Sequence, residues 1–284
     1  MKSNLNYSNK FRILKGGKIS LIVSALLGSV TISFASPSGG TVTNGTANIS
    51  QNGNTTNINQ STNKASINWQ NFDIASNETV NFNQPNSSSV TLNRVVGLNN
   101  SVINGALNAN GQVILVNPNG IVFNQGSTVN VGGLIATTKN ITDQDFQNDN
   151  YIFEGNSEAS ILNKGTITAQ NYVAMMGKEV VNEGTILATL GKVELVGGDK
   201  FTLNLNGNSL LNLSIDEATL NALIENKGLI KADGGVVHLT TKALNSVLDG
   251  VVNNTGVIGA KTLSAHEKGE IILFAHGGEA NRAG

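Results

Sequence analysis

A short phrase recurs along this chain of 284 residues: an aliphatic residue, then Asn-x-Gly, then another aliphatic residue. The clearest copies contain Asn163, Asn182, Asn226 and Asn254, each with a glycine two positions later. Each copy is followed by a second strand-like run, such as 192–196. Repetition of one small unit is typical of a solenoid, whose turns bury their apolar faces only by stacking on one another.

The spacing of these asparagines predicts the length of a turn. They are 19, 44 and 28 residues apart, so 19 residues make one turn, and 44 make either two turns or one turn with an insertion. Most strand-like runs alternate between polar and apolar residues, which directs one face inward. Because Asn and Gly tolerate left-handed backbone conformations, Asn-x-Gly is expected to form the corners. Phe123-Asn124-Gln125-Gly126 reads as an earlier copy.

The predicted fold is all-β, a right-handed parallel β-helix. Fixing one turn of about 20 residues costs roughly 20–40 kcal/mol of backbone entropy. Burying four or five aliphatic side chains returns only about 6–15 kcal/mol, so neighbouring turns must share hydrogen bonds and a core. A β-sandwich with Greek-key turns is the alternative, but it leaves the repeated Asn-x-Gly corners unexplained.

Two segments interrupt the repeat. Residues 200–214 form two alternating runs around Asn206-Gly207, a strong hairpin signal, and are predicted to project from the helix as an antiparallel pair. Residues 139–158 are acidic and irregular, and are expected to leave the helix as a solvated loop; their carboxylate spacing matches no familiar calcium loop. Helical periodicity is nearly absent, and its best candidate is 216–224.

The two ends of the chain have their own signals. Residues 1–35 hold five basic residues, no acid and an apolar run, and read as a signal peptide cleaved between Ala35 and Ser36; an N-terminal membrane anchor is the alternative. Residues 36–100 are rich in Asn, Ser and Thr and contain Trp69, and are predicted to cap the open end of the solenoid. Residues 101–284 are predicted to form the parallel β-helix, and the stop just after a strand suggests a piece of a longer protein.

Charge and composition argue against several classes of function. Beyond residue 35 the chain has 13 basic and 19 acidic residues, a net charge of −6, which gives no electrostatic footprint for nucleic acid. There is no cysteine, and the three histidines form no HExxH pair, so neither a metal site nor a cofactor is predicted. We expect no enzyme. A secreted polysaccharide-active β-helix enzyme is the alternative, but the only arginines beyond residue 35 are Arg94 and Arg282.

Three stretches carry a resemblance to a known family: 92–95, 105–121 and 129–137. Together they resemble the N-terminal secretion domain of two-partner secretion exoproteins, which include filamentous haemagglutinins, high-molecular-weight adhesins, haemolysins and contact-dependent inhibition toxins. The resemblance covers essentially all of residues 36–284. Some members carry a second, upstream Asn-Pro-Asn-Leu motif; here Leu98-Asn99-Asn100 is the nearest equivalent, which leaves transporter contacts at that point open.

The most specific motif of this resemblance is Asn117-Pro118-Asn119-Gly120-Ile121, which the resemblance assigns to transporter recognition. The residue types predict a tight turn, because Pro fixes φ and Asn-Gly can take left-handed conformations. The motif can therefore be a plain corner of the helix. It can also be recognised as an extended segment before folding and become a corner afterwards.

The resemblance implies a route out of a Gram-negative cell. The chain would cross the inner membrane through the general secretory translocon. The POTRA domains of a dedicated outer-membrane β-barrel transporter would then recognise it, and it would fold outside as a β-helix. The expected product is a surface-exposed or secreted adhesin-type exoprotein, whose contacts with a host or bacterial cell surface lie in a missing C-terminal part.

Overall fold

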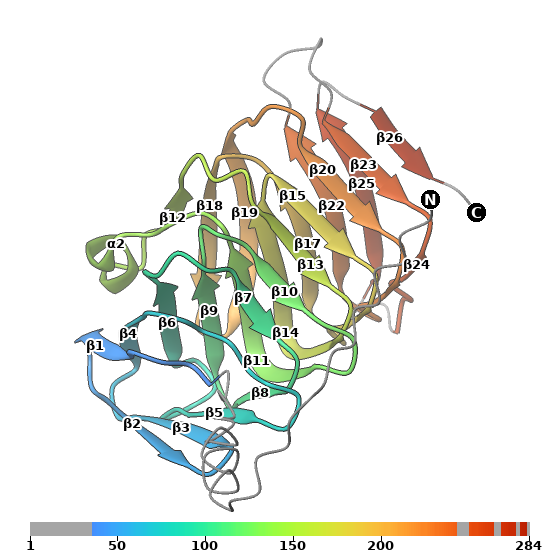
Figure 1. The fold of residues 1–284 in the computed structure, drawn as a ribbon. Coiled ribbons are helices and arrows are strands. Elements are labelled where there is room, and N and C mark those ends of the chain that lie inside the picture. Colours follow the sequence, from blue (N-terminus) through green and yellow to red (C-terminus); the bar gives the residue numbers. More distant parts are fainter. Residues whose placement is uncertain (1–35, 243–249, 264–267, 277–278, 283–284) are drawn as a thin grey trace, which may run out of the picture. The chain divides into compact units, whose positions relative to one another are not determined.

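The computed structural model describes residues 36–242, 250–263, 268–276 and 279–282. Most of these residues lie in strands, and most strand pairs are parallel. Successive turns of the chain stack from the blue to the red end of the sequence and form a parallel β-helix with three faces (Figure 1). In the described part of the chain, no helix is both long and apolar enough to cross a membrane. The predicted signal peptide lies outside the described residues.

Face 1 carries the longest strands, which pair in parallel from one turn to the next. Its strands are β4 (Lys64–Trp69), β6 (Val90–Val95), β9 (Gln112–Val116), β11 (Thr128–Thr137), β14 (Thr166–Gly177), β17 (Lys192–Gly197), β22 (Val236–Lys242) and β25 (Glu270–His276). The first halves of β11 and β14 belong to a different face, because the chain turns a corner within each strand, at a register shift between Val131 and Gly133 in β11.

Faces 2 and 3 consist of short strands. Face 2 contains the first halves of β11 and β14 together with β3 (Thr55–Gln60), β5 (Thr79–Asn83), β8 (Ala106–Ala109), β16 (Thr185–Leu187), β21 (Leu229–Lys231) and β24 (Val257–Gly259). Face 3 contains β7 (Ser101–Ile103), β10 (Ile121–Phe123), β13 (Ser160–Asn163), β15 (Glu179–Asn182), β20 (Leu223–Asn226), β23 (Val251–Asn254) and β26 (Glu279–Arg282).

The inner side chains of the three faces form one aliphatic core, which follows from the alternation in the sequence. Fully buried members are Val113, Leu134, Val173, Val193 and Val237 on face 1, Leu107, Val129, Ile167, Ile186 and Ile230 on face 2, and Ile121, Ile161, Val180, Ile224 and Val252 on face 3. Each turn shares this core with its neighbours, so the prediction of a stacked solenoid is confirmed.

Antiparallel pairing occurs at the N-terminal end of the β-helix. Strand β1 (Thr41–Asn44) pairs antiparallel with β4, and β2 (Ala47–Asn52) pairs antiparallel with β3. Parallel pairing already begins at β3 and β4, inside the 36–100 region. The division of the chain at residue 100 stays a prediction. Trp69 is buried in the core here, and its ring N–H donates to the side-chain oxygen of Asn93 over 3.0 Å.

The repeated Asn-x-Gly phrases stand at corners of the helix, where face 3 turns into face 2. Asn163, Asn182, Asn226 and Asn254 are buried and form a ladder, in which each Nδ2 donates to the next Oδ1 over 2.8, 2.7 and 2.7 Å. Strand β15 pairs directly with β20, so the 44-residue interval is one turn with an insertion. The ladder gives each buried amide a partner in the next turn, as buried polar groups require.

The glycines of these phrases serve a purpose other than the predicted one. Gly165, Gly184, Gly228 and Gly256 do not have positive φ, so the prediction of left-handed corners is wrong for them. A Cβ atom at Gly184 would lie 2.2 Å from the carbonyl oxygen of Gly165, and one at Gly228 would lie 2.0 Å from that of Gly184. Consecutive corners pass too close for any side chain, and this contact is what requires glycine.

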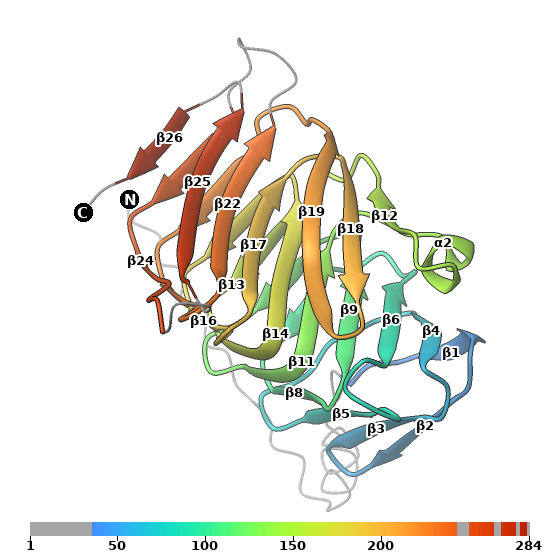
Figure 2. The same ribbon diagram turned by 180° about the vertical axis from the view of Figure 1, so that it is seen from behind.

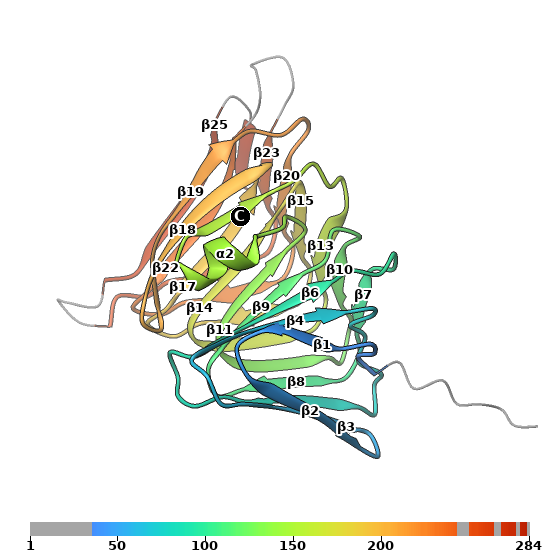
Figure 3. The same ribbon diagram turned by 90° about the vertical axis from the view of Figure 1, so that its left-hand side faces the viewer.

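The interruptions of the repeat form a second layer outside face 1. Strand β18 (Lys200–Asn206) and β19 (Ser209–Glu217) are antiparallel around Asn206–Ser209, which confirms the hairpin, and β12 (Tyr151–Glu154) pairs antiparallel with β18. Figures 2 and 3 show this sheet lying against the strands of face 1. Its Phe153, Phe201 and Leu203 pack with outward side chains of face 1, such as Leu92 and Ile114, in a separate apolar cluster.

The predicted excursion contains the one helix among the described residues, α2 (Asp143–Gln147). Thr142 caps it, because its hydroxyl accepts a hydrogen bond from the Asp145 N–H. The best helical candidate in the sequence, 216–224, is not a helix: this stretch is the end of β19, a turn and the start of β20. The leucine and alanine spacing there reflects strand ends and a turn instead of a helix face.

Glu194 and His238 form an ion pair on the outer side of face 1. The Glu194 carboxylate is buried and lies 3.0 Å from Nδ1 of His238 on the neighbouring strand. This hydrogen bond raises the pKa of His238 above its ordinary value, against the opposing effect of burial. Lys192 lowers the pKa of His238 and Glu270 raises it, both to a smaller extent.

We expect the unfolding free energy to depend on this pair at mildly acidic pH. A raised pKa in the folded state makes the stabilisation complete below the unfolded pKa of about 6.5, and it is lost as the pH rises through the folded value. Urea unfolding midpoints from about pH 5 to 9 should therefore fall more for the wild-type chain than for His238→Gln, which keeps a polar side chain without the charge. Parallel profiles for both chains would contradict this.

Candidate functional site

The motif Asn117–Ile121 forms the corner between β9 and β10, as predicted. Gly120 N–H donates to the Asn117 carbonyl oxygen over 3.0 Å, which closes a four-residue turn. Asn119 N–H donates to the Asn117 side-chain oxygen over 2.9 Å, so this side chain reinforces the turn. Gly120 has φ +105° and takes the conformation expected for it, whereas Asn119 does not have positive φ.

The two asparagine side chains of the motif bind the preceding turn of the helix. Asn117 Nδ2 donates to the Asn99 carbonyl oxygen and to Ser101 Oγ, both over 3.0 Å. Asn119 Nδ2 donates to the Gly97 carbonyl oxygen over 2.9 Å. The motif therefore fastens the segment 97–101, which precedes it by about one turn, as well as making its own corner.

Burial divides the motif into two parts. Asn117, Gly120 and Ile121 are buried, and Ile121 pairs in β10 between β7 and β13. Pro118 and Asn119 are exposed at the tip of the turn. Ser157, at the end of the excursion, donates from its hydroxyl to the Pro118 carbonyl oxygen over 2.5 Å. In the folded chain, only the tip of the motif is open to a partner.

The segment beside the motif presents an apolar side chain to solvent. Leu98 is 91% exposed and Val96 is 47% exposed, although both are flanked by backbone that is bonded to the motif. Leu98-Asn99-Asn100 is the nearest equivalent here of the upstream motif that some family members carry. The structure bonds Asn99 of this stretch to Asn117, and the adjacent Gly97 to Asn119, contacts that the sequence does not predict.

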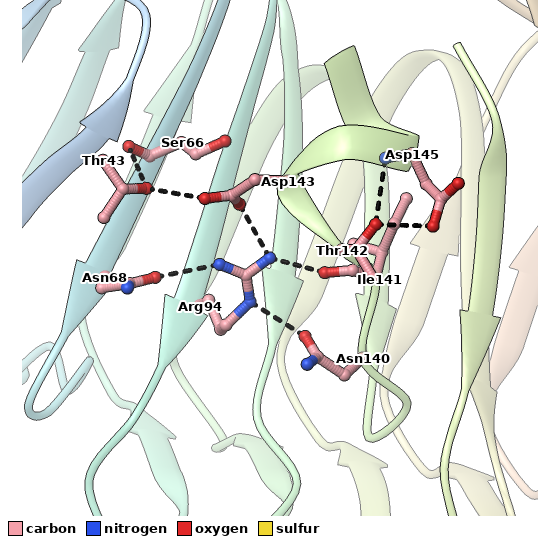
Figure 4. A network of polar contacts seen from close by, with 9 residues as sticks. All are labelled: Thr43, Ser66, Asn68, Arg94, Asn140, Ile141, Thr142, Asp143 and Asp145. Carbon is pink, nitrogen blue, oxygen red and sulfur yellow. Dashed lines mark hydrogen bonds and ion pairs between the residues drawn. The ribbon is translucent and has the colours of Figure 1, made fainter. Parts of the chain in front are cut away.

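Arg94, in the family-like stretch 92–95, fastens the excursion to face 1 (Figure 4). Its guanidinium donates to the Asn140 side-chain oxygen, the Ile141 carbonyl oxygen and Asp143 over 2.9, 2.5 and 3.0 Å. It also donates to Asn68 on β4 over 3.0 Å. Thr43 of β1 donates to the other oxygen of Asp143 over 3.2 Å, so strands β1, β4 and β6 all hold α2 in place.

Four of the five acidic residues of the excursion form ion pairs with basic side chains of the β-helix and the hairpin, and the fifth, Asp145, accepts from the Thr142 hydroxyl. Four ion pairs form: Asp143 with Arg94, Asp149 with Lys64, Glu154 with Lys200, and Glu158 with Lys178. Across the described ranges, no group of three His, Cys, Asp or Glu side chains could hold a metal ion. Asp143 and Asp149 therefore attach the excursion to face 1, and Glu154 pairs inside the second layer, so the excursion is not the free loop that the sequence predicts.

The predicted cleavage point lies at the edge of the described chain. Ala35 lies outside it, and Ser36 is its first residue. Ser36 Oγ donates to a carboxylate oxygen of Glu78 over 2.6 Å and accepts from Gln51 Nε2 over 3.0 Å. Cleavage between Ala35 and Ser36 stays a prediction.

Comparison with known proteins identifies relatives in sequence and in fold. The heme/hemopexin-binding protein of Haemophilus influenzae is 39% identical over 272 residues, which cover 90% of this chain and 29% of that protein. The HMW1 secretion domain of Haemophilus influenzae matches with a TM-score of 0.75 and 32% identity, over 87% of this chain and 64% of that one. The filamentous hemagglutinin secretion domain shares the fold, with a TM-score of 0.50 and 16% identity over 85% of this chain and 98% of that one.

The chain thus spans about 29% of the length of the curated relative that it matches. A family model described as the TPS secretion domain matches residues 33–284, which include all of the chain beyond the predicted signal peptide. The chain belongs to the TPS secretion domain family, the secretion domains of two-partner secretion exoproteins.

Proposed function

We propose that residues 36–284 direct the export of their exoprotein by binding, through Asn117–Ile121, to the periplasmic POTRA domains of a dedicated outer-membrane β-barrel transporter. Residues 1–35 deliver the chain to the general secretory translocon beforehand and are removed at Ala35–Ser36. The chain then folds outside the cell as the β-helix described above. The role is recognition and folding, without catalysis.

The motif carries this proposal. It combines a family-specific sequence with a position in which Asn117 and Asn119 connect two turns of the helix. The corner between β14 and β15, which also leads from face 1 to face 3, contains only Lys178, so such a corner can be built without Pro118 and without a second asparagine. The additional residues of the motif therefore support a role besides that of a corner.

The proposed destination follows from the same route. Export through an outer-membrane barrel places the β-helix at the cell surface or in the medium. Contacts with host or bacterial cells, and any ligand of the kind named for the Haemophilus influenzae relative, would belong to the exoprotein beyond this domain. The relative is much longer than the matched region, which supports that division.

Secretion with and without the partner tests the proposal. Residues 1–284 are expressed in a Gram-negative host with or without the neighbouring barrel gene, and the medium and periplasm are assayed. We expect release only with the barrel, and slower release for Asn119→Ala, which removes an exposed side chain with a single long-range bond. Asn117→Ala should abolish release, because it also leaves the buried corner incomplete.

The matched control for this experiment is Asn100→Ala, because Asn100 is an exposed asparagine beside the motif but outside it. It should be released at the wild-type rate. Release of the wild-type chain without the barrel, or retention in the periplasm with it, would show that the family resemblance extends to the fold alone.

A further inference from the structure

The fold uses every polar group of Asn117, the first residue of the motif. Both side-chain N–H groups of Asn117 have acceptors, Asn99 O and Ser101 Oγ. Its side-chain oxygen accepts from the backbone and side chain of Asn119, its N–H donates to Thr137 O, and its carbonyl oxygen accepts from Gly120. Because Asn117 is also fully buried, a partner of the folded chain has no group of this residue to bind.

The rest of the motif is similarly occupied. The Gly120 carbonyl oxygen accepts from Ser101 N–H over 3.0 Å, and the Ile121 side chain is fully buried in the core. Asn119 Nδ2 is bonded to Gly97 O. The segment 97–101 therefore supplies partners to three of the five motif residues: Asn117, Asn119 and Gly120.

We infer that the segment 97–101 and the transporter compete for the motif, so that closure of this corner releases the domain from the transporter. The inference rests on the proposed function and concerns the regulation of the same site. A partner that reads the motif as an extended segment needs the amide groups and the apolar side chain that 97–101 and the core occupy after folding. Binding and folding of this corner are then mutually exclusive.

The positions of the two segments in the sequence are consistent with competition between segment 97–101 and the transporter. The segment 97–101 precedes the motif by about 20 residues, so both leave the membrane at nearly the same time. No distant part of the chain is needed to supply the competing groups. The excursion adds a later contact, Ser157 to Pro118, which fixes the exposed tip of the turn once residues to 158 have emerged.

The first test compares folded and unfolded chain. The secreted chain, native or denatured in urea and freshly diluted, is applied to the immobilised periplasmic region of the partner barrel. Apparent affinity scales with the fraction of chain in the binding-competent state, so the native chain should bind roughly 100-fold more weakly or worse. Equal affinity of native and denatured chain would overturn the inference, because the exposed Pro118 and Asn119 would then suffice.

The second test blocks the competitor and leaves the motif intact. A Cβ atom at Gly97 would lie 2.0 Å from the Gln70 carbonyl oxygen, so Gly97→Val prevents the segment from closing. Loaded in the denatured state, this variant should stay bound on the order of tenfold longer than the wild-type chain, whose release should coincide with gain of protease resistance. Leu98→Ser is the matched control, since Leu98 is 91% exposed, and should be released like the wild-type chain.

The outcomes separate the two proposals. Release of Gly97→Val at the wild-type rate would overturn the competition while leaving transporter binding in place. Absence of binding by the denatured wild-type chain would instead contradict the proposed function itself, and the competition with it. Loss of binding by Leu98→Ser would show that the segment is a transporter contact and not a competitor.

Discussion

A chain that carries both Gly165→Val and Gly184→Val should fail to form a protease-resistant domain. A Cβ atom at Gly165 would lie 2.1 Å from Ser127 Oγ, and one at Gly184 would lie 2.2 Å from the backbone oxygen of Gly165. The second contact is with backbone, which cannot move without separating two turns. Overpacking costs about 1–3 kcal/mol at one site, occasionally more, and here the contact with backbone places the cost at the upper end. Two adjacent sites that strain the same stack should therefore remove about 6 kcal/mol, comparable with the whole stability of a marginal domain, roughly 5–15 kcal/mol.

The measurement is limited proteolysis and the urea midpoint of the secreted product. The control is Gly259→Val, because a Cβ atom at Gly259 has no atom within 4 Å and the backbone there has no positive φ. That chain should keep the wild-type midpoint within the small range typical of surface changes. Unchanged protease resistance of the double variant would show that the corners are not as closely packed as described.

Asn182→Asp should destabilise the domain by roughly 2–5 kcal/mol at neutral pH. Asn182 is fully buried between Asn163 and Asn226, accepting from the first and donating to the second. A carboxylate of the same shape can accept but cannot donate, and it would face the side-chain oxygen of Asn226 without water. The change thus leaves a buried charge and breaks one step of the ladder.

The pH dependence of the stability of Asn182→Asp shows whether the buried charge causes the loss. Burial and the facing oxygen would raise the pKa of the introduced carboxyl, so the folded state binds its proton more tightly than the unfolded state does. The loss of stability should therefore be small near pH 4 and grow as the pH rises, in unfolding curves measured across that range. Asn130→Asp, on the exposed face, is the control and should show little change; a pH-independent loss at 182 would point to packing instead.

The regular part of the fold could be predicted because it repeats. Alternation fixed the inward residues of the strands, and the recurring phrase located the corners. The reason given for the corners was wrong, since closeness between turns, and not left-handed backbone, excludes side chains at Gly184 and Gly228. A distance between residues one turn apart depends on register, which a local conformational preference does not contain.

The irregular part was predicted only as interruptions. Asn206-Gly207 revealed the hairpin, but nothing local showed that Phe201 would pack on the outer side of face 1 or that β12 would pair with it. The one helix of the described residues lies in the acidic excursion, where Thr142 caps it, and not at 216–224, the best helical candidate in the sequence. These contacts join segments some 50 residues apart, as β12 and β18 are, and pattern within a short window cannot report them.

The candidate site, too, is predicted from the sequence only in part. The residue types of Asn117–Ile121 predicted a turn, and Gly120 takes the expected conformation. Nothing in the sequence of segment 97–101 predicts its contacts with the motif; Leu98-Asn99-Asn100 differs there from the upstream motif of some family members. The contacts with the motif are made by backbone carbonyl oxygens of Gly97 and Asn99. Every residue has a backbone carbonyl, so residue types cannot reveal which one makes such a contact.

The asparagine ladder has a consequence for how such domains diversify. Its steps span 19, 44 and 28 residues, yet the amide distances stay between 2.7 and 2.8 Å. The longest step contains the whole hairpin, which leaves the helix after β17 and returns before β20. Chain length between rungs is thus uncoupled from rung geometry. Insertions at this point can lengthen, shorten or acquire new surface chemistry during evolution while the register of every later turn is preserved.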